Sequence, residues 1–285
     1  MAYVISELNL ERQKLLGKVL APVTDRLLSA LQLRSGVRGL DLGCGIGETT
    51  RQLARTLDKP KEIVGLELNP DLVETAKKLS SDQDDRVSFE QGDVSALEFA
   101  DNSFDFVFAR YLLMHLFEPE AVLKEMLRVC KSGGAVAVQE PDFSFQRCYP
   151  DSWAYERLPD LFRRLFPDAF LGRKLWSLFQ KLGYSSSNVL VDCMVEVNQN
   201  DLRRCYRLSV EAMEKAVIEK GIYSESEFER LRAELERVDF AENLVTLLVD
   251  IASVQKRTEA TGSEAHFWLP QKKKRSEERR VGKEC

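Results

Sequence analysis

Three glycines that alternate with other residues follow a short apolar run that carries one carboxylate. The run spans residues 37–42 and includes Asp41, and Gly43, Gly45 and Gly47 come directly after it. The periodic segment beyond the last glycine is typical of a helix, so the pattern predicts a strand, a tight turn and a helix start. Glycines allow positive φ and a close approach of ligand to backbone, and a helix start offers free N–H groups. We therefore expect a small-molecule site, and the Asp41 carboxylate suits a ligand with an ammonium group better than one with two phosphates.

The glycine spacing also bears on which nucleotide-like ligand could bind. A dinucleotide-binding fingerprint would place its third glycine at position 48, where this chain has Glu48. An NAD-dependent oxidoreductase is consequently a weaker interpretation, although it stays open at this point.

Carboxylates recur where the next two predicted strands end. Glu67 ends the run 62–67, and an acid at that point of a βαβ unit can accept hydrogen bonds from both hydroxyls of a ribose. Asp93 follows the run 86–91, where its carboxylate and the backbone N–H of Val94 could contact the edge of an adenine. Together, the carboxylates at the ends of these predicted strands indicate a site that binds a nucleoside.

Two further predicted strands complete the series. The run 104–109 leads into Arg110 and Tyr111, and the run 135–139 follows a helix that is expected to stop at residues 132–134. Five strands alternating with helices predict an α/β fold with an open, mostly parallel, doubly wound Rossmann-like sheet and ligands at the carboxyl ends of the strands.

His115 lies a few residues beyond the fourth predicted strand. It is the natural candidate for a general base that reaches an acceptor hydroxyl or amine. The alternative is that His115 packs within the loop beneath the site.

These residues, taken together, resemble a known family. The stretch Asp41–Gly47, Glu67, residues 92–94, 104–116 and 131–134 are similar in order and spacing to class I S-adenosylmethionine-dependent methyltransferases of the small-molecule type often grouped with ubiquinone and menaquinone methylases. The resemblance spans about residues 36–140. It implies a seven-stranded sheet whose last strand is antiparallel, with a helical cap.

The resemblance also implies roles for single residues, with S-adenosyl-L-methionine as the cofactor and no metal. The cofactor-binding residues that it implies are Asp41, Gly43, Gly45, Gly47, Glu67, Leu68, Asp93, Val94 and Arg110. The candidate catalytic residues are His115, Arg110 and Tyr111. A non-catalytic domain that binds the methyl donor or a partner protein remains an alternative.

The acceptor is expected to be a small, partly apolar or aromatic metabolite. The chain carries a formal net charge of −5, and residues 272–285 hold seven basic and three acidic side chains, so the remainder is more acidic still. An acidic body argues against nucleic acid as a partner. No Asp/Asn-Pro-Pro-aromatic signature follows the fourth strand and no Pro-Cys pair occurs, whereas aromatic residues are frequent between positions 143 and 179. Whether oxygen, nitrogen or carbon accepts the methyl group is left open.

The remaining segments are expected to surround this core. Residues 8–33 have a helical pattern interrupted at Pro22, and the resemblance implies that the N-terminal helices of residues 1–35 lie over the cofactor mouth, with Tyr3, Glu11 and Arg12 as possible donor contacts. Residues 36–258 form the expected methyltransferase domain, with a helical cap insertion at about 199–240. The predicted elements beyond the fifth strand are strands at 189–197 and 244–254 and helices at 201–219 and 225–238, the last with a capping box at Ser224 and Glu227.

Two further expectations concern the end of the chain and the cellular compartment of the protein. Residues 272–285 resemble the translation of a sequencing adapter and are expected to be a non-native tail. His266, beyond the last predicted strand, is expected to be peripheral. No signal peptide or membrane-length apolar run is visible, and six cysteines without a Cys-x-x-Cys pair suit a cytoplasmic enzyme. The oligomeric state is left open.

Overall fold

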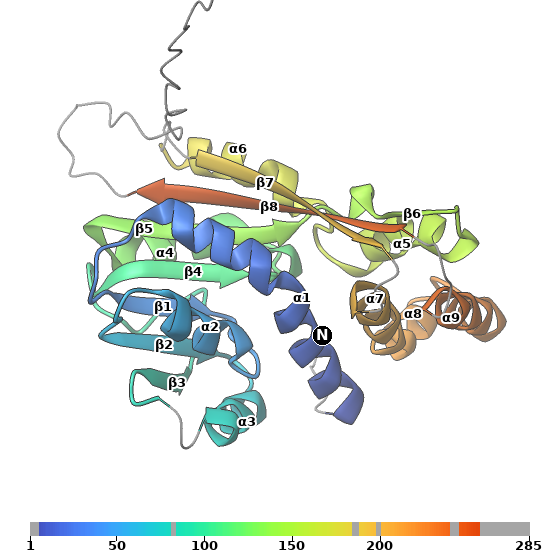
Figure 1. The fold of residues 1–285 in the computed structure, drawn as a ribbon, viewed down its shortest axis with the longest axis horizontal. Coiled ribbons are helices and arrows are strands. Elements are labelled where there is room, and N and C mark those ends of the chain that lie inside the picture. The colour runs from blue at the N-terminus through green and yellow to red at the C-terminus, as the bar shows by residue number, and fades with distance from the viewer. Residues whose placement is uncertain (1–5, 81–83, 184–187, 198–200, 240–244, 257–285) are drawn as a thin grey trace, which may run out of the picture.

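The computed structural model describes residues 6–80, 84–183, 188–197, 201–239 and 245–256. Tyr3, His266 and the tail 272–285 therefore lie outside the described residues. The described chain forms a twisted sheet with helices on both faces and a group of helices beyond one end (Figure 1).

Five parallel strands make up the larger part of the sheet, in the order β3-β2-β1-β4-β5. They are β1 (Arg38–Leu42), β2 (Glu62–Glu67), β3 (Val87–Gln91), β4 (Phe104–Arg110) and β5 (Cys130–Pro141). The helices between them are α2 (Glu48–Thr56), α3 (Pro70–Ser80) and α4 (Pro119–Val129). The Rossmann-like α/β architecture expected from the alternating pattern is confirmed.

Three further strands extend the sheet beyond β5. β8 (Val245–Lys256) runs antiparallel to β5, and both β7 (Asn188–Val197) and the short β6 (Arg147–Tyr149) pair antiparallel with β8. Among the described residues the sheet has eight strands in place of the expected seven, because residues 147–149 pair with β8 after the chain leaves β5.

Strand β4 shows how the core is divided between the two faces. Phe106 and Phe108 point to one face, where they pack with residues of α1 and α2 such as Leu27, Leu31 and Leu53. Val107 and Ala109 point to the other face, where they pack with Val122, Leu123 and Met126 of α4. Successive residues of a strand alternate between faces, so a strand covered on both sides is apolar throughout.

Helix α1 (Glu7–Leu31) is one continuous helix, so the interruption expected at Pro22 is wrong. Proline removes one backbone hydrogen bond, but the chain stays helical through it, with Leu20, Val23 and Leu27 buried before and after Pro22. The helix begins at Ser6, whose hydroxyl accepts a hydrogen bond from the N–H of Asn9.

The predicted helix boundaries differ from the observed ones at two further places. Helix α4 ends at Val129, and Gly133 and Gly134 belong to β5, whose pairing with β4 shifts register between Phe104 and Phe106. The single helix expected at 201–219 is two helices, α7 (Asp201–Glu211) and α8 (Glu214–Glu219).

The remaining helices lie after β5. They are α5 (Trp153–Leu165), α6 (Leu175–Lys181) and α9 (Glu225–Asp239), with the short 3-10 helices η1 (Leu113–His115), η2 (Phe143–Phe145) and η3 (Leu171–Lys174). The capping box of α9 forms as predicted, because the Ser224 N–H donates to Glu227 and the Glu227 N–H donates to the Ser224 hydroxyl.

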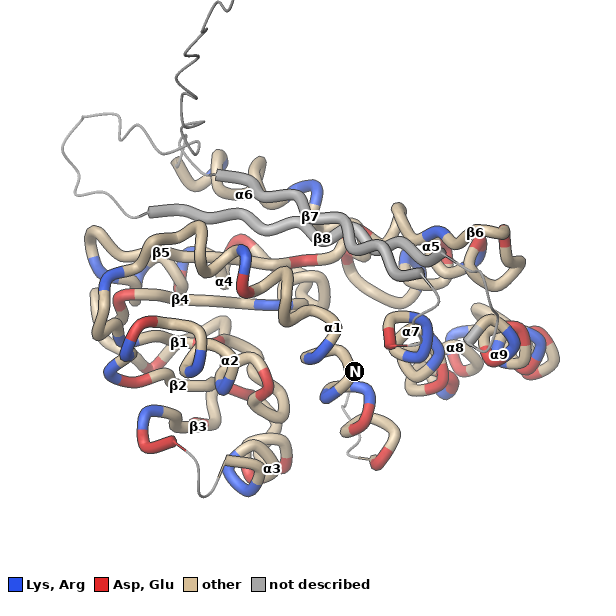
Figure 2. Tube along the Cα trace, viewed as in Figure 1, with Lys and Arg blue, Asp and Glu red and all other residues tan. Residues whose placement is uncertain are grey.

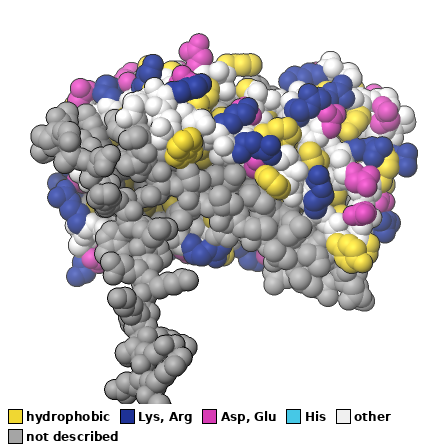
Figure 3. Space-filling view, turned by 90° about the horizontal axis from the view of Figure 1, so that it is seen from above, with side chains coloured by type: hydrophobic (Ala, Val, Ile, Leu, Met, Phe, Trp, Pro, Cys, Tyr) yellow, Lys and Arg dark blue, Asp and Glu magenta, His cyan; other side chains and the backbone are white. Residues whose placement is uncertain are grey.

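Helices α7, α8 and α9 occupy the interval between β7 and β8 where the cap insertion was expected. Helix α1 runs between the sheet and α7 (Figure 1), and Lys18 of α1 forms an ion pair with Asp201 of α7 at 2.5 Å. Glu11 also pairs with Arg204. Charged residues concentrate on these helices (Figure 2), and on the face seen in Figure 3 positive, negative and apolar side chains are interspersed.

No helix in the part of the chain that the structure describes is long and apolar enough to cross a membrane.

Candidate functional site

The glycine-rich turn joins β1 to α2 at the carboxyl edge of the sheet. All three glycines have positive φ, with values of +65° at Gly43, +55° at Gly45 and +81° at Gly47, a region that residues with a Cβ rarely adopt. The Cys44 N–H donates to the carbonyl of Leu66, which fastens the turn to β2. Helix α2 starts directly after Gly47, so its first N–H groups open toward the turn.

Glu67 lies at the tip of β2 beside this turn, as the sequence predicted. Its Oε2 accepts a hydrogen bond from the Gly45 N–H at 3.1 Å, and its Oε1 accepts one from the Asn69 N–H at 3.0 Å. The next residue, Leu68, exposes 62% of its surface. A carboxylate and an exposed apolar side chain therefore stand next to the glycine turn.

Asp41 is 1% exposed and lies beneath the turn. The Thr50 hydroxyl of α2 donates to its Oδ2 at 2.7 Å, so Asp41 ties β1 to the start of α2. Burial raises the pKa of Asp41 to about 7, against the lowering effects of the Thr50 hydrogen bond and of Arg110; Glu67 raises it further. Near pH 7, the protonated and the ionised forms of Asp41 are therefore present in similar amounts.

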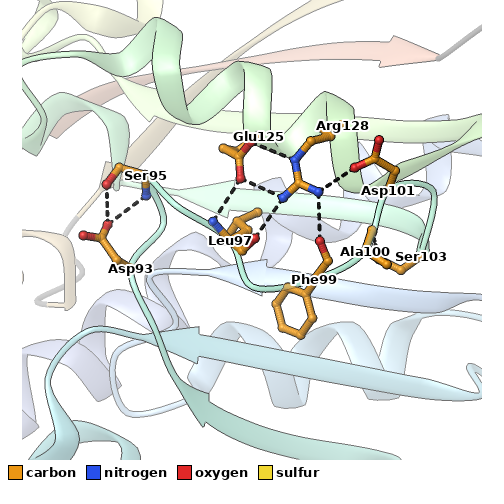
Figure 4. A network of polar contacts seen from close by, with 9 residues as sticks. All are labelled: Asp93, Ser95, Leu97, Phe99, Ala100, Asp101, Ser103, Glu125 and Arg128. Atoms are coloured by element: carbon orange, nitrogen blue, oxygen red, sulfur yellow. Dashed lines mark hydrogen bonds and ion pairs between the residues drawn. The ribbon is translucent and has the colours of Figure 1, made fainter.

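Asp93 follows β3 and is exposed, whereas Val94 is buried. The N–H and the hydroxyl of Ser95 both donate to the Asp93 Oδ1, at 2.8 and 2.7 Å (Figure 4). These bonds hold the pKa of Asp93 below its ordinary value. The turn therefore presents an ionised carboxylate at the edge that also carries Glu67.

Arg128 of α4 fastens the loop that follows Asp93, a role that sequence reasoning missed. Its guanidinium donates to the carbonyls of Leu97 at 2.9 Å and Phe99 at 2.8 Å, while Glu125 accepts the Leu97 N–H at 2.9 Å (Figure 4). Arg128 also pairs with Asp101 at 2.7 Å and with Glu125 at 2.8 Å. We call Glu125 and Arg128 the loop clamp; the only sequence signal for it is an acid and a base three residues apart on one helix.

Helix α1 contacts the glycine turn and the start of α2. The Gln13 Oε1 accepts a hydrogen bond from the Ile46 N–H at 3.1 Å. At Gly17 a Cβ would lie 2.9 Å from the Cβ of Glu48, so glycine allows α1 to approach the start of α2 closely. The sequence pointed to Glu11 and Arg12 on this helix as donor contacts, and it missed the adjacent Gln13, which contacts the turn.

Arg110 ends β4, yet its guanidinium turns toward α1 and α2. It donates to the Thr24 hydroxyl at 3.0 Å and to the Gln52 Oε1 at 3.3 Å. Gln52 in turn donates to the carbonyl of Ala21 and to Asp25. These bonds join β4 to both helices, and they give Arg110 a structural role beside the site contact expected from the sequence.

The loop after β4 is held by a buried carboxylate. Glu140 at the end of β5 is fully buried, and its Oε1 accepts the N–H groups of Leu112 at 2.9 Å and Leu113 at 2.7 Å. Tyr111 adopts a φ of +54° and donates its N–H to the carbonyl of Gln139. Glu140 therefore fixes the start of η1, the 3-10 helix that ends in His115.

His115 contacts an aromatic cluster formed by Phe143, Phe162 and Phe166. The imidazole meets Phe166 edge-on with ring centroids 4.9 Å apart, and Phe143 packs on Phe162 at 4.5 Å. Part of the His115 side chain is exposed to solvent. Desolvation by the surrounding protein atoms, followed by the positive charge of the nearby Arg12, lowers the pKa of the imidazole to about 4. The imidazole is consequently neutral at physiological pH and is a weak base.

Within the described residues, no three His, Cys, Asp or Glu side chains converge as metal ligands.

Two curated relatives are similar to part of this chain. The 27-O-demethylrifamycin SV methyltransferase of Amycolatopsis mediterranei is 38% identical over 118 residues, which are 41% of this chain and 43% of the relative. The demethylmenaquinone methyltransferase of Staphylococcus aureus is 32% identical over 115 residues, which are 40% of this chain and 47% of the relative. This chain therefore matches less than half the length of these curated relatives.

The fold has counterparts among solved structures. The YcgJ protein of Bacillus subtilis superposes with a TM-score of 0.54 at 17% identity, covering 84% of this chain and 98% of that one. At this level of identity the likeness concerns the fold alone. The family model described as a methyltransferase domain matches residues 33–190, which is more than half of the chain. The protein therefore belongs to the methyltransferase-domain family.

Proposed function

We propose that the protein is an S-adenosyl-L-methionine-dependent methyltransferase that acts on a small, partly apolar or aromatic metabolite. The observation that carries this proposal is the convergence of the glycine turn, Glu67 and Asp93 on one edge of the sheet. Leu42 pairs with Leu66, and Glu67 pairs with Gln91 in the parallel register, so the three strand tips stand side by side.

Each group on this edge suits one part of the donor. The turn from Gly43 to Gly47 leaves room for the methionine moiety against its backbone. The carboxylate of Glu67 can accept hydrogen bonds from the ribose hydroxyls, Leu68 can pack on the adenosine, and Asp93 can accept from the adenine amine while Val94 contacts the ring.

The donor, when bound, supplies an activated methyl group on a sulfonium. In-line transfer then requires proximity, orientation and the exclusion of water rather than strong acid–base catalysis. The protein contributes the loop from Tyr111 to His115, which Glu140 holds in place, and helix α1, which covers the glycine turn. Since its pKa is about 4, we expect His115 to accept a hydrogen bond from the acceptor rather than to remove a proton from a weak acid.

The aromatic residues around His115, on what we call the acceptor side, favour a flat or apolar substrate. The exposed His115 contacts Phe166, which stacks on the buried rings of Phe143 and Phe162, and Phe117, two residues further along the chain, is 91% exposed. The two curated relatives are named for a rifamycin and a menaquinone precursor, both small molecules. We extend that substrate class, and not either substrate, to this chain.

An oxidoreductase that uses NAD is the less favoured alternative. Glu48 takes the position of the third fingerprint glycine and forms an ion pair with Arg51 at 2.7 Å, so it places a charge where a pyrophosphate would approach. A non-catalytic donor-binding domain is the other alternative, and donor turnover separates it from an enzyme.

Calorimetric titration of the full chain with S-adenosylhomocysteine, and separately with NAD, tests the proposal. We expect micromolar affinity for S-adenosylhomocysteine and no heat with NAD. Binding of NAD alone would overturn the cofactor assignment, and binding of neither would leave only the fold.

A further inference from the structure

Gln13 places its side-chain amide directly against the glycine turn. Its Oε1 accepts a hydrogen bond from the Ile46 N–H at 3.1 Å. A Cβ built on Gly45 would lie 2.2 Å from this Oε1, 3.4 Å from the Cδ and 4.0 Å from the Nε2. The whole amide group therefore stands beside the Cα of Gly45, on the side where any other residue would carry its side chain.

The approach of α1 to the turn is set one helical turn further along, at Gly17. A Cβ there would lie 2.9 Å from the Cβ of Glu48, so the helix comes this close to α2 only with glycine at this position. Residues four apart lie on the same face of a helix, so Gln13 and Gly17 face the same way. The close contact at Gly17 thus brings the Gln13 amide to the turn.

Solvent, and hence a ligand, can reach this part of the turn. Gln13, Gly43 and Gly45 are each partly exposed, whereas Ile46 and Gly47 are buried. Because the amide stands beside the Gly45 Cα, a ligand that lies along the turn from Gly43 to Gly45 also meets Gln13. The methionine moiety of the donor is the part that we place there.

The contact with Ile46 also settles which end of the amide faces the turn. A backbone N–H is a donor, so the atom opposite it is the carbonyl oxygen of Gln13, and the NH2 group is at the other end. An NH2 group of an amide only donates. Of the two charged groups at the amino-acid end of the donor, the carboxylate can accept such a hydrogen bond and the ammonium cannot.

We propose that the NH2 group of Gln13 binds the carboxylate of the methionine moiety, so that Gln13 selects ligands that carry an amino-acid end. This inference rests on the proposed function. Hydrogen bonds to an ionised acceptor are stronger than those between neutral groups. The bond to Ile46 already holds the amide in place, so less conformational freedom is lost when the ligand binds.

Calorimetry of the full chain with two ligands tests this role. S-adenosylhomocysteine carries the amino-acid end, whereas methylthioadenosine has the same adenosine and sulfur and a methyl group in its place. We expect Gln13→Met to lower the affinity for S-adenosylhomocysteine by about 10- to 100-fold and to leave that for methylthioadenosine within about twofold.

Gln13→Glu separates a role in ligand binding from a role in holding the turn. Glutamate keeps an oxygen for the Ile46 N–H, but it removes the N–H donors and adds a negative charge. We therefore expect a larger loss of S-adenosylhomocysteine affinity than in Gln13→Met, again with methylthioadenosine unaffected. Lys14→Met is the control, because Lys14 is the exposed neighbour on α1 and its loss makes the chain more negative by the same amount. It should bind both ligands as the wild type does.

Two results would overturn the inference and leave the proposed function standing. One is wild-type affinity for S-adenosylhomocysteine in Gln13→Glu, which would mean that Gln13 only holds the turn. The other is an equal loss of both ligands in that variant. If Gln13→Met does not fold, Gln13→Glu still decides, since it keeps the contact with Ile46. A wild type that binds neither ligand refutes the proposed function, and the role of Gln13 falls with it.

Discussion

The tips of β1, β2 and β3 present backbone N–H groups and carboxylates, whereas the tips of β4 and β5 present aromatic rings and a buried glutamate. On the first side, the contacts join positions close in the sequence or on neighbouring strands, as between Gly45 and Glu67. On the second side, Glu140 likewise holds the loop after the neighbouring strand β4, and packing between aromatic side chains is added, as between Phe143 and Phe162 of α5.

In the proposed function, this difference corresponds to a difference in ligand between the cofactor side and the acceptor side. A cofactor that is the same in every turnover can be bound by main-chain groups whose geometry the fold itself fixes. An acceptor differs from one enzyme to the next, and its site is made of side chains that can be exchanged without altering the strands.

Gly45→Val should have the largest effect on cofactor binding. A Cβ would lie 2.2 Å from the Gln13 Oε1, and valine strongly disfavours the φ of +55°. We expect the affinity for S-adenosylhomocysteine to fall by about 100-fold or more, measured by calorimetry. Gly36→Val is the control, since Gly36 also has positive φ but no atom within 4 Å of its Cβ position. Similar affinity in wild type and Gly45→Val contradicts the assignment.

Asp93→Ala should have the next largest effect. Loss of a charged acceptor for the adenine amine is expected to cost about 1.5–3 kcal/mol, or roughly 10- to 100-fold in affinity. Asp84→Ala is the comparison, because Asp84 also has a lowered pKa but stands at the opposite end of β3. If both variants bind as the wild type does, Asp93 does not contact the donor.

Arg128→Met tests whether the loop clamp positions Asp93. The wild type should prefer S-adenosylhomocysteine to S-inosylhomocysteine, which lacks the adenine amine, and the variant should lose most of that preference, an effect on the order of tenfold. Combining it with Asp93→Ala should give no further loss.

The control for the clamp is Arg163→Met, which breaks an exposed pair with Asp160 on α5. A lower melting temperature with unchanged discrimination in Arg128→Met would show that Arg128 is structural only.

The smallest expected effect concerns His115 on the acceptor side. Because its pKa is lowered to about 4, its imidazole resonances should stay constant between pH 8 and pH 5.5 in NMR titration. The unfolded chain takes up this proton near pH 6.5, so His115 also makes stability fall as the pH drops below that value. The chain has only two histidines, so His115→Asn suffices for assignment. A midpoint near 6.5 would restore His115 as a general base.

The sequence predicted the strands and their tips well and the contacts between distant elements poorly, for a physical reason. The strand Glu62–Glu67 has the predicted bounds and Glu67 stands at its tip as expected, because apolar runs, turn glycines and tip carboxylates are local signals. Gln13 and Arg128 were missed because their contacts depend on which elements meet in space. Pro22 misled the prediction because tertiary packing keeps α1 helical through it.

The raised pKa of Asp41 links the cofactor side to protons. Burial lifts this pKa to about 7 from its ordinary 3.8, so between these values the folded chain keeps a proton that the unfolded chain has released. Asp41 therefore makes the fold progressively less stable as the pH rises from about 4 to 7, and adds no further change above that. A ligand whose ammonium group favours the ionised carboxylate would expel this proton on binding. Its affinity would then increase with pH up to about 7, and its heat of binding would depend on the ionisation enthalpy of the buffer.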